Sequence, residues 1–481
     1  MSTNNNAIFV GGEWHAPASS GVITVISPNT EQVLGRTPDG TNADMDLAVN
    51  AARRAFDDPT GWSRWDPAQR APAMRRLADA LDARAPEIAR AVSAQNGTPV
   101  ASTEKLESVF PPILLRYYAN LIENDGFEQT RSGLLGGSTL VTKSPIGVVG
   151  AIVPSNFPQS LSAFRYAPAL AAGCTIVIKP SPETVLDSYL LGEAIEEADL
   201  PAGVINIVPG GVKLGAYLVS HRGIDKIAFT GSPATGRTIA EVCGRLLRPV
   251  SLELGGKSAA IILDDANLNL EVVGEQLFSA TVLDNSQVCH LGVRLLAPQA
   301  RYDEVVDAFS SLAASLTVGS SLDTATMVGP LKSARRRERV EAYIARGTED
   351  GARITVGGGR PRELDKGWFV EPTVFANVDS NYTIAQEEIF GPVLSIIPYR
   401  GDDDAVRIAN SNDFEVGGTV FTSDHDHGVA VARRIQSGTV GINGYLSDPT
   451  VPIVGLESSG LSRDLGPEAL SAYLVPKSIY L

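Results

Sequence analysis

The feature that most constrains the fold is a regular alternation of short β-branched runs and amphipathic segments between residues 146 and 254. Such alternation favours a parallel β-sheet covered by helices on both faces. Sheets of this kind bind ligands at the carboxyl ends of their strands. The predicted strands are residues 147–153, 175–179, 204–208, 226–230 and 250–254, and the predicted helices include residues 158–172 and 183–197.

The flanking segments predict two further parts of the molecule. Upstream, residues 44–56 and 67–96 have helical periodicity, and the glycine-rich stretch 127–144 predicts a projecting β-hairpin. A second α/β region follows Leu254, and the tail 474–481 predicts a strand. Its predicted strands include residues 293–297, 393–398 and 439–443, and its predicted helices include residues 302–316, 334–347 and 403–409.

Composition limits the partners and the compartment. The 481 residues are 43% hydrophobic, with 40 Lys+Arg against 55 Asp+Glu, which gives a net charge of −15. A chain this acidic repels phosphate backbones and anionic lipid, so neither nucleic acid nor a membrane is expected as a partner. The sparse cysteines, Cys174, Cys243 and Cys289, exclude a disulfide scaffold. No signal peptide is apparent, and we therefore expect a cytoplasmic protein.

The common catalytic and nucleotide-binding motifs are absent. The sequence has no G-x-G-x-x-G, no G-x-S-x-G and no H-E-x-x-H. The run 255–258, Gly-Gly-Lys-Ser, fails as a P-loop because Ser251 stands where the first glycine is required. His425 and His427 flank Asp426 in a polar segment that favours a solvated turn, so no metal site is predicted.

Polar residues at predicted strand ends form the first part of a candidate site. The amide of Asn156 could stabilise an oxyanion, or it could simply form a turn. Lys179 and Ser181 could bind a ribose or a phosphate, or terminate the strand. The run 229–236, with Gly231, Ser232 and Gly236, leads from a strand into a helix whose first amides could bind a pyrophosphate.

A carboxylate and a thiol form the second part of the candidate site. Glu253 lies in Glu-Leu-Gly-Gly-Lys, and Cys289 follows 36 residues later after Gln287-Val288. These groups could supply a base and a nucleophile, although a lone cysteine is more often a small core residue.

In this order, these segments resemble the NAD(P)-dependent aldehyde dehydrogenase superfamily over nearly the whole chain, from the Phe9 run to the Tyr480 run. The most specific motifs are residues 253–257, the Gln-x-Cys at 287–289, and residues 387–392, Glu-Glu-Ile-Phe-Gly-Pro. The resemblance implies a Rossmann-like nucleotide-binding domain, a second α/β catalytic domain and a β-hairpin oligomerisation arm. The expected nucleotide-binding domain is 1–126 with 144–253, the expected catalytic domain is 254–449, and the expected arm is 127–143 with 466–481.

The resemblance also implies a reaction. The sulfur of Cys289 attacks an aldehyde, Asn156 holds the oxyanion, and Glu253 activates water to hydrolyse the thioester that remains after hydride transfer to NAD(P)⁺. The residues implied to bind the cofactor are Ile152, Ser155, Lys179, Ser181, Gly231, Ser232, Gly236, Leu254, Glu388 and Phe390. The residues implied to line the substrate pocket are Phe110, Phe157, Phe164, Val288, His290, Tyr445 and Ile453, and their apolar character predicts a hydrophobic aldehyde.

Several positions depart from the family pattern. Ser155 replaces the usual tryptophan, and Arg165 replaces a lysine tied to proton exit and cannot deprotonate at working pH. Ile453, Leu456 and Glu457 replace a phenylalanine, an aromatic residue and a lysine, and Asp464 stands where Glu is commoner. These departures leave rate, cofactor affinity and substrate range open, while His290 next to the nucleophile either lowers the pKa of the thiol or shapes the pocket.

Alternatives follow from these departures. Pro182 stands where many NAD-preferring members have Glu, so NAD is the favoured cofactor and NADP the alternative. A CoA-acylating semialdehyde dehydrogenase is a rival function, against which Glu253 argues. A weakly active or non-catalytic nucleotide-binding protein is another. The arm implies a homodimer or a homotetramer.

Overall fold

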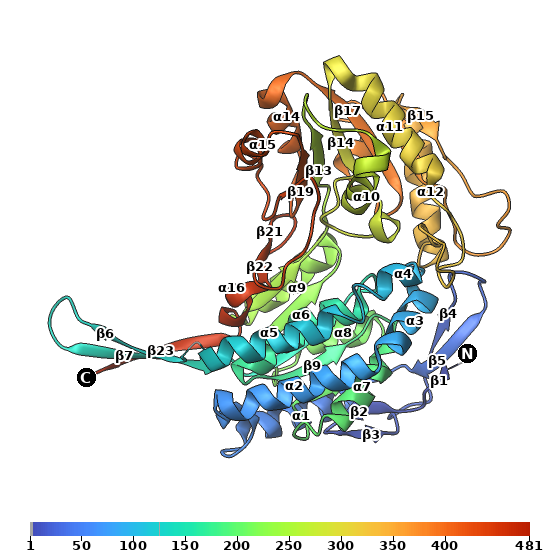
Figure 1. The fold of residues 1–481 in the computed structure, drawn as a ribbon. Coiled ribbons are helices and arrows are strands. Elements are labelled where there is room, and N and C mark those ends of the chain that lie inside the picture. The colour runs from blue at the N-terminus through green and yellow to red at the C-terminus, as the bar shows by residue number, and fades with distance from the viewer. Residues whose placement is uncertain (1–2, 125) are drawn as a thin grey trace.

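The computed structural model describes residues 3–124 and 126–481 and contains two lobes, each built on a seven-stranded sheet (Figure 1). The first sheet has the order β12-β11-β8-β9-β10-β2-β3 and is parallel from β12 to β10. Its strands are β12 Val250–Glu253, β11 Lys226–Thr230, β8 Val148–Ile152, β9 Thr175–Lys179, β10 Ile205–Ile207, β2 Ile8–Val10 and β3 Glu13–His15.

Helices cover both faces of this sheet, as its hydrophobic strands require. Alternate residues of β8 face opposite ways, so Val149 and Ala151 join one core cluster and Val148 joins the other. The first cluster packs under α2 Pro67–Ala83, α5 Phe110–Asn124, α6 Pro158–Ala172 and α7 Asp187–Glu197. The second packs under α1 Asn42–Asp57, α8 Val212–Ser220 and α9 Pro233–Arg245.

The second lobe repeats this layered design. Its sheet has the order β15-β16-β17-β14-β13-β19-β20, and β15 at one edge is antiparallel. The strands are β15 Arg353–Val356, β16 Thr373–Ala376, β17 Val393–Tyr399, β14 Arg294–Pro298, β13 Ala259–Ile262, β19 Gly418–Phe421 and β20 Gly441–Ile442. One face is covered by α10 Leu270–Thr281 and α11 Tyr302–Ser315, and the other by α12 Ala334–Glu349, α14 Gly401–Ala409 and α15 His425–Ala432.

Three predicted element boundaries were wrong. The expected helix 67–96 is divided at Arg84 into α2 and α3 Ala85–Asn96, because Pro86 lies in the first turn of α3 and cannot continue a helix that precedes it. The expected helix 183–197 begins at Asp187, since a turn closed by Thr184 N–H to Ser181 O precedes it. The expected strand 439–443 is reduced to β20.

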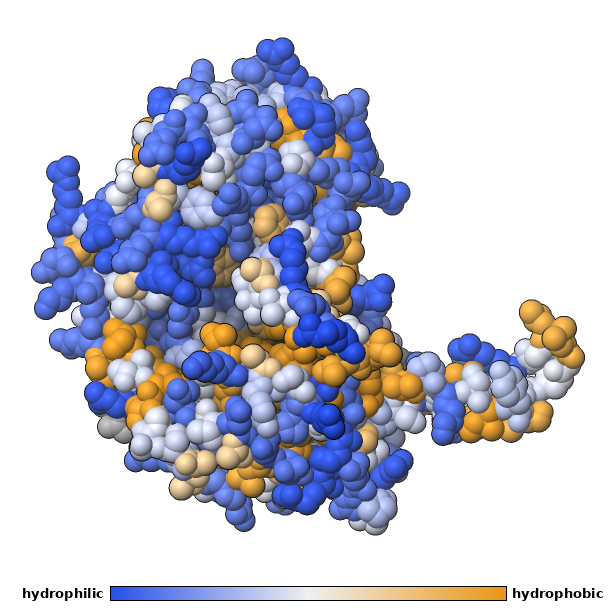
Figure 2. Space-filling view, turned by 180° about the vertical axis from the view of Figure 1, so that it is seen from behind, coloured by the Kyte–Doolittle hydropathy of each residue, from blue (hydrophilic) through white to orange (hydrophobic). Residues whose placement is uncertain are grey.

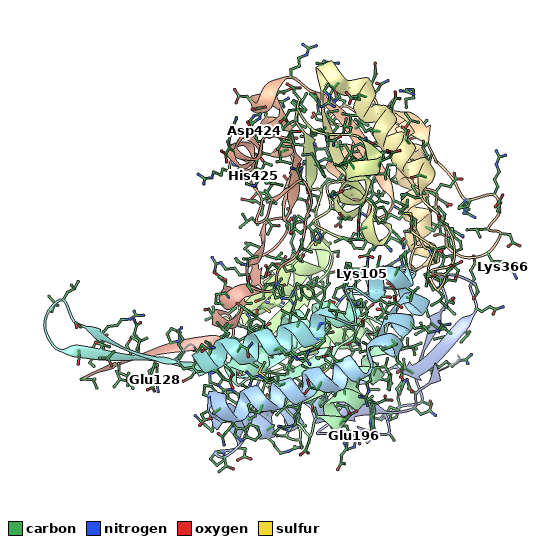
Figure 3. The ribbon with its side chains drawn as sticks, in the orientation of Figure 1. Lys105, Glu128, Glu196, Lys366, Asp424 and His425 are labelled. Atoms are coloured by element: carbon green, nitrogen blue, oxygen red, sulfur yellow. The ribbon has the colours of Figure 1, made fainter. Side chains whose placement is uncertain are left out.

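A three-stranded arm extends from the first lobe (Figures 1 and 2). It consists of β6 Glu128–Ser132, β7 Ser138–Pro145 and β23 Leu474–Tyr480, with β7 in the centre. Figure 3 shows Glu128 on this arm, outside the body of the molecule. The C-terminal part of the expected arm was placed too early, because residues 466–471 form α16 Gly466–Ser471, which packs against α6.

Shorter elements complete the described chain. They are β1 Thr3–Asn4, β4 Val22–Ile26, β5 Val33–Pro38, β18 Phe414–Glu415, β21 Ile453–Glu457, β22 Ser462–Asp464, α4 Val100–Thr103, α13 Thr383–Gln386 and the 3-10 turns Trp62–Arg64, Leu283–Ser286 and Gln299–Arg301. Within residues 3–124 and 126–481, the helices are all too short or too polar to cross a membrane.

Candidate active site

A cavity of about 1960 Å³ opens at the carboxyl ends of β8, β9, β11 and β12 and is also lined by residues of the second lobe. Figure 3 shows Lys105, which lines this cavity, between the two lobes. Pockets for a single small molecule measure roughly 300–1,000 Å³, so this cavity has room for a dinucleotide and a second ligand together. All the predicted site residues except Gly236 line it.

Gly236 is the one predicted site residue that does not line this cavity, and its contact with the cofactor stays a prediction. Gly236 lies in α9 and is buried, and a Cβ added there would stand 2.5 Å from the Cδ2 of Leu254. This glycine therefore allows α9 to pack closely on the residue that follows β12. Its contribution is to helix packing, away from the cavity wall.

Cys289 follows a strained segment of backbone. Asp284, Asn285 and Ser286 have φ values of 53°, 60° and 52°, in the left-handed region that non-glycine residues rarely adopt. Such a run persists only where its surroundings hold it. The side chain of Asn285 supplies that hold, because it donates to the carbonyls of Gly97 and Pro330 at 3.1 Å and accepts from the N–H of Gly329 at 2.7 Å.

The Cys289 sulfur lies at the cavity wall in a setting that keeps it protonated. Burial raises the pKa of this thiol to about 12, with further increases from the charges of Glu253 and Glu388. The side-chain amide of Asn156 is bound to the backbone just before Cys289. Its Nδ2 donates to the carbonyl of Gln287 at 3.0 Å. An amide nitrogen carries two N–H donors, and this bond uses one of them.

Glu253 ends β12 and is buried beside a chain of charged groups. The hydroxyl of Ser462 donates to one of its carboxylate oxygens. Burial raises the pKa of Glu253, and the neighbouring charge of Asp464 raises it further. A carboxyl group with a raised pKa is suited to act as a base near neutral pH.

The buried guanidinium of Arg165 in α6 is ion-paired with Asp464 and donates to the hydroxyl of Thr230 at 2.6 Å. Burial alone would lower the pKa of Arg165, but the charges of Asp464, Tyr473 and Glu253 outweigh it, so the pKa is raised. This residue therefore remains a fixed cation.

Most of the predicted cofactor-binding residues line the cavity from the first lobe, and Glu388 and Phe390 line it from the second lobe. The ammonium of Lys179 donates to the carbonyls of Pro180 and Gly210 at 2.8 and 2.9 Å, and burial lowers its pKa to about 8. Ser232 is the N-cap of α9, with its hydroxyl accepting from the N–H of Thr235. From the second lobe, the carboxylate of Glu388 accepts from the N–H of Gly256 at 2.9 Å.

The predicted substrate-pocket residues form an aromatic wall near the thiol. The rings of Phe110 and Phe164 lie 5.7 Å apart, and His290 stacks on Tyr445 with ring centroids 4.2 Å apart. Burial lowers the pKa of His290 to about 4, so the imidazole is neutral at neutral pH. A neutral ring supplies no positive charge to the thiolate, which favours the pocket-shaping interpretation of His290.

Sequence reasoning missed two residues that contact the predicted site. Lys332 precedes α12 and donates to the hydroxyl of Ser155, and Ser462 in β22 donates to Glu253. Both reach the site through tertiary contacts, and no local motif marks them. His425 and His427, in contrast, lie in α15 away from the cavity, and Figure 3 shows His425 on the outer surface of the second lobe.

Comparison with known proteins decides the family. The sequence model described as the Aldehyde dehydrogenase family matches residues 14–479. This chain belongs to that family. It is 54% identical over its whole length to geranial dehydrogenase of Castellaniella defragrans, with all of both chains covered. It is also 39% identical to the putative aldehyde dehydrogenase DhaS of Bacillus subtilis, over 98% of this chain and 95% of the relative.

Solved structures of the family share the fold. The aldehyde dehydrogenase of Mycobacterium tuberculosis, complexed with NAD⁺, is 42% identical with a TM-score of 0.97, over 100% of this chain and 99% of that one. A mutant aldehyde dehydrogenase C of Pseudomonas syringae, complexed with NAD⁺ and octanal, is 34% identical with a TM-score of 0.94, over 99% and 96%. These findings confirm the predicted family, the α/β fold class and aldehyde oxidation as the reaction of this aldehyde dehydrogenase.

Gly256 allows a close approach of backbone to the nucleophile. A Cβ at Gly256 would overlap the carbonyl oxygen of Cys289, so we expect Gly256→Ala to displace the thiol and lower kcat by about 100-fold. Gly244 in α9 is the matched control, because a Cβ there meets nothing. Gly244→Ala should keep wild-type kcat and raise the unfolding free energy by roughly 0.5–1 kcal/mol. Wild-type kcat in Gly256→Ala would contradict this account.

Glu253→Gln tests the electrostatics around the thiol. Removing this negative charge should lower the pKa of Cys289, so that the ligand-free enzyme at pH 9.5 is alkylated by iodoacetamide about 3- to 10-fold faster. Glu275→Gln, another carboxylate of the cavity wall, should leave the rate unchanged. Peptide mapping identifies the modified cysteine. An equal or slower rate of alkylation in Glu253→Gln would show that the charge of Glu253 does not raise the pKa of Cys289.

Proposed function

We propose that this chain oxidises a hydrophobic aldehyde to the carboxylic acid with NAD⁺ as the hydride acceptor, through a thioester on Cys289 that Glu253 helps to hydrolyse. The observation that carries the proposal is that Cys289, Asn156 and Glu253 line one cavity that is large enough for cofactor and substrate together. Asn156, Glu253 and Cys289 are the proposed catalytic residues.

The residues present fit a dinucleotide. A buried ammonium at Lys179, the capped N-terminus of α9 and the acceptor Glu388 are the kinds of groups that hold ribose hydroxyls and phosphates. The two sheets support a division into a nucleotide-binding domain, 1–126 with 144–253, and a catalytic domain, 254–449. NAD⁺ is preferred in this proposal, since the structural relatives named above are NAD⁺ complexes. NADP⁺ is the alternative.

The chain's own residues carry out the covalent steps. The Cys289 thiol loses its proton to a base, and its sulfur forms a bond to the carbonyl carbon of the aldehyde. The second N–H of Asn156 and the backbone N–H of Cys289 hold the oxygen as it becomes negative. A bound NAD⁺ would supply the acceptor for the hydride that leaves this carbon. Glu253 then takes a proton from water, whose oxygen displaces the sulfur, so that the acid leaves and the thiol is restored.

The pocket's chemistry supports an apolar substrate. Aromatic and aliphatic side chains dominate the wall around Cys289, and a fully buried cation or anion that could pair with a charged aldehyde is not among the predicted pocket residues. A relative is named for geranial and a structural relative holds octanal, both aldehydes with long hydrocarbon chains. A terpenoid or a medium-chain aliphatic aldehyde is therefore the proposed substrate class.

Turnover of an aldehyde panel tests the proposal. With NAD⁺ we expect hexanal, octanal and citral to be oxidised with kcat/KM at least about tenfold above succinic semialdehyde, because the predicted pocket residues include no cation that could pair with a carboxylate. Cys289→Ala should abolish turnover, while Cys174→Ala should retain it. A preference for the charged aldehyde would refute the substrate class. Product formation that depends on CoA would favour the acylating rival, and cofactor binding without turnover of any aldehyde would favour the non-catalytic one.

We also propose that the arm joins copies of this chain into a homodimer or homotetramer in the cytoplasm. The tip carries Leu134 and Leu135, which are fully exposed, and Figure 2 shows this tip as hydrophobic. Isolated exposed leucines are common, but two at the end of a projecting arm are suited to bury against another copy.

Leu134→Asp with Leu135→Asp tests this assembly. We expect the double variant to have a lower molecular mass by light scattering, because burying two carboxylates at the interface is unfavourable. Leu247→Asp, another fully exposed leucine outside the arm, is the control and should keep the wild-type mass. An unchanged mass in the arm variant would argue against a role of the tip in assembly.

A further inference from the structure

The side chain of Lys332 links the two lobes at the cavity wall. It precedes α12 in the second lobe, and its ammonium donates to the hydroxyl of Ser155 in the first lobe. The carboxylate of Glu183 lies 3.8 Å from the same nitrogen, and the ring centre of Phe390 lies 5.6 Å from it. The side chain is only 9% exposed, yet it lines the cavity.

The sheet topology fixes where this ammonium lies. Ser155 follows β8, and β8 lies between β9 and β11. The turn after β9 carries Lys179, the proposed ribose contact, and the turn after β11 carries Gly231 and Ser232, the proposed pyrophosphate contact. The ammonium on Ser155 therefore lies at the strand end between these two ligand contacts.

The present partners of Lys332 leave it able to bind an anion. An ammonium has three N–H donors, and the bond to Ser155 uses one of them. Glu183 at 3.8 Å lies beyond hydrogen-bonding distance. The cavity wall as a whole is less acidic than the chain, since seven Lys and Arg against six Asp and Glu line it, compared with 40 against 55 overall.

We propose that Lys332 is a cofactor-binding residue that donates to the pyrophosphate of the dinucleotide, and that Ser155 positions it. This inference rests on the proposed NAD⁺-dependent function. A tryptophan at position 155, as the family pattern has, would occupy the place of the ammonium, because Nζ lies within hydrogen-bonding distance of the small hydroxyl. Ser155 and Lys332 thus form a unit in which a small residue makes room for a cation from the opposite wall.

Equilibrium binding tests the contact independently of turnover. Dissociation constants are measured by calorimetry for NAD⁺ and ADP-ribose, and by competition for adenosine, which carries no phosphate. Loss of a charge-assisted hydrogen bond should weaken binding of NAD⁺ and ADP-ribose to Lys332→Met by about tenfold or more, and leave adenosine unchanged within about twofold. Arg335→Met, an exposed cation of the same cavity wall, is the matched control and should bind all three as wild type.

Two further variants separate the contact from a folding defect. Lys332→Arg keeps the charge and should bind NAD⁺ within about threefold of wild type, while Ser155→Ala keeps the cation but frees it and should weaken NAD⁺ by about threefold. Equal affinities of wild type and Lys332→Met for NAD⁺ and ADP-ribose would overturn the inference, as would a loss for NAD⁺ alone, which would place the contact on the nicotinamide side. Failure of the wild type to bind NAD⁺ would instead overturn the proposed function.

Discussion

The buried ion pair between Arg165 and Asp464 is the interaction on which the catalytic side of the structure depends. It joins α6 of the first lobe to β22, which also carries Ser462, the hydroxyl donor to Glu253. Removing one partner of such a pair would leave an uncompensated charge in the interior, which costs roughly 3–5 kcal/mol. The pair therefore ties the position of Glu253 to the packing of α6.

The same pair sets the electrostatics of the proposed base. Asp464 raises the pKa of Glu253, whereas Arg165 lowers it, and the two charges act from fixed positions. Because the guanidinium does not titrate at working pH, it holds the field at Glu253 constant where a lysine would exchange protons. The cavity that Glu253 lines is therefore the route that we propose for a proton leaving this carboxyl group.

Sequence periodicity was sufficient for the five parallel strands of the first sheet, because strands buried on both faces are nearly continuous hydrophobic runs. It did not identify β13, β16 and β19 of the second sheet. Periodicity was also insufficient where a proline ends a helix or a glycine allows close packing between elements. Pro86 divides a helix whose apolar spacing continues across the break, and Gly236 serves packing against Leu254. The strand-end residues of the site were predictable from motifs, whereas Lys332 was not, since only the approach of the second lobe brings it to Ser155.

The protonation state of the Cys289 thiol in the ligand-free enzyme follows from the groups that line the cavity. An apolar wall and two carboxylates favour the neutral thiol, which reacts slowly with oxidants and alkylating agents. The pKa of the Cys289 thiol is raised by burial and by the charges of Glu253 and Glu388. Any positive charge brought next to the sulfur therefore lowers this pKa again. The oxidised nicotinamide ring carries such a charge and the reduced ring does not. A bound oxidised cofactor would therefore favour the thiolate, and the neutral His290 does not supply that positive charge itself.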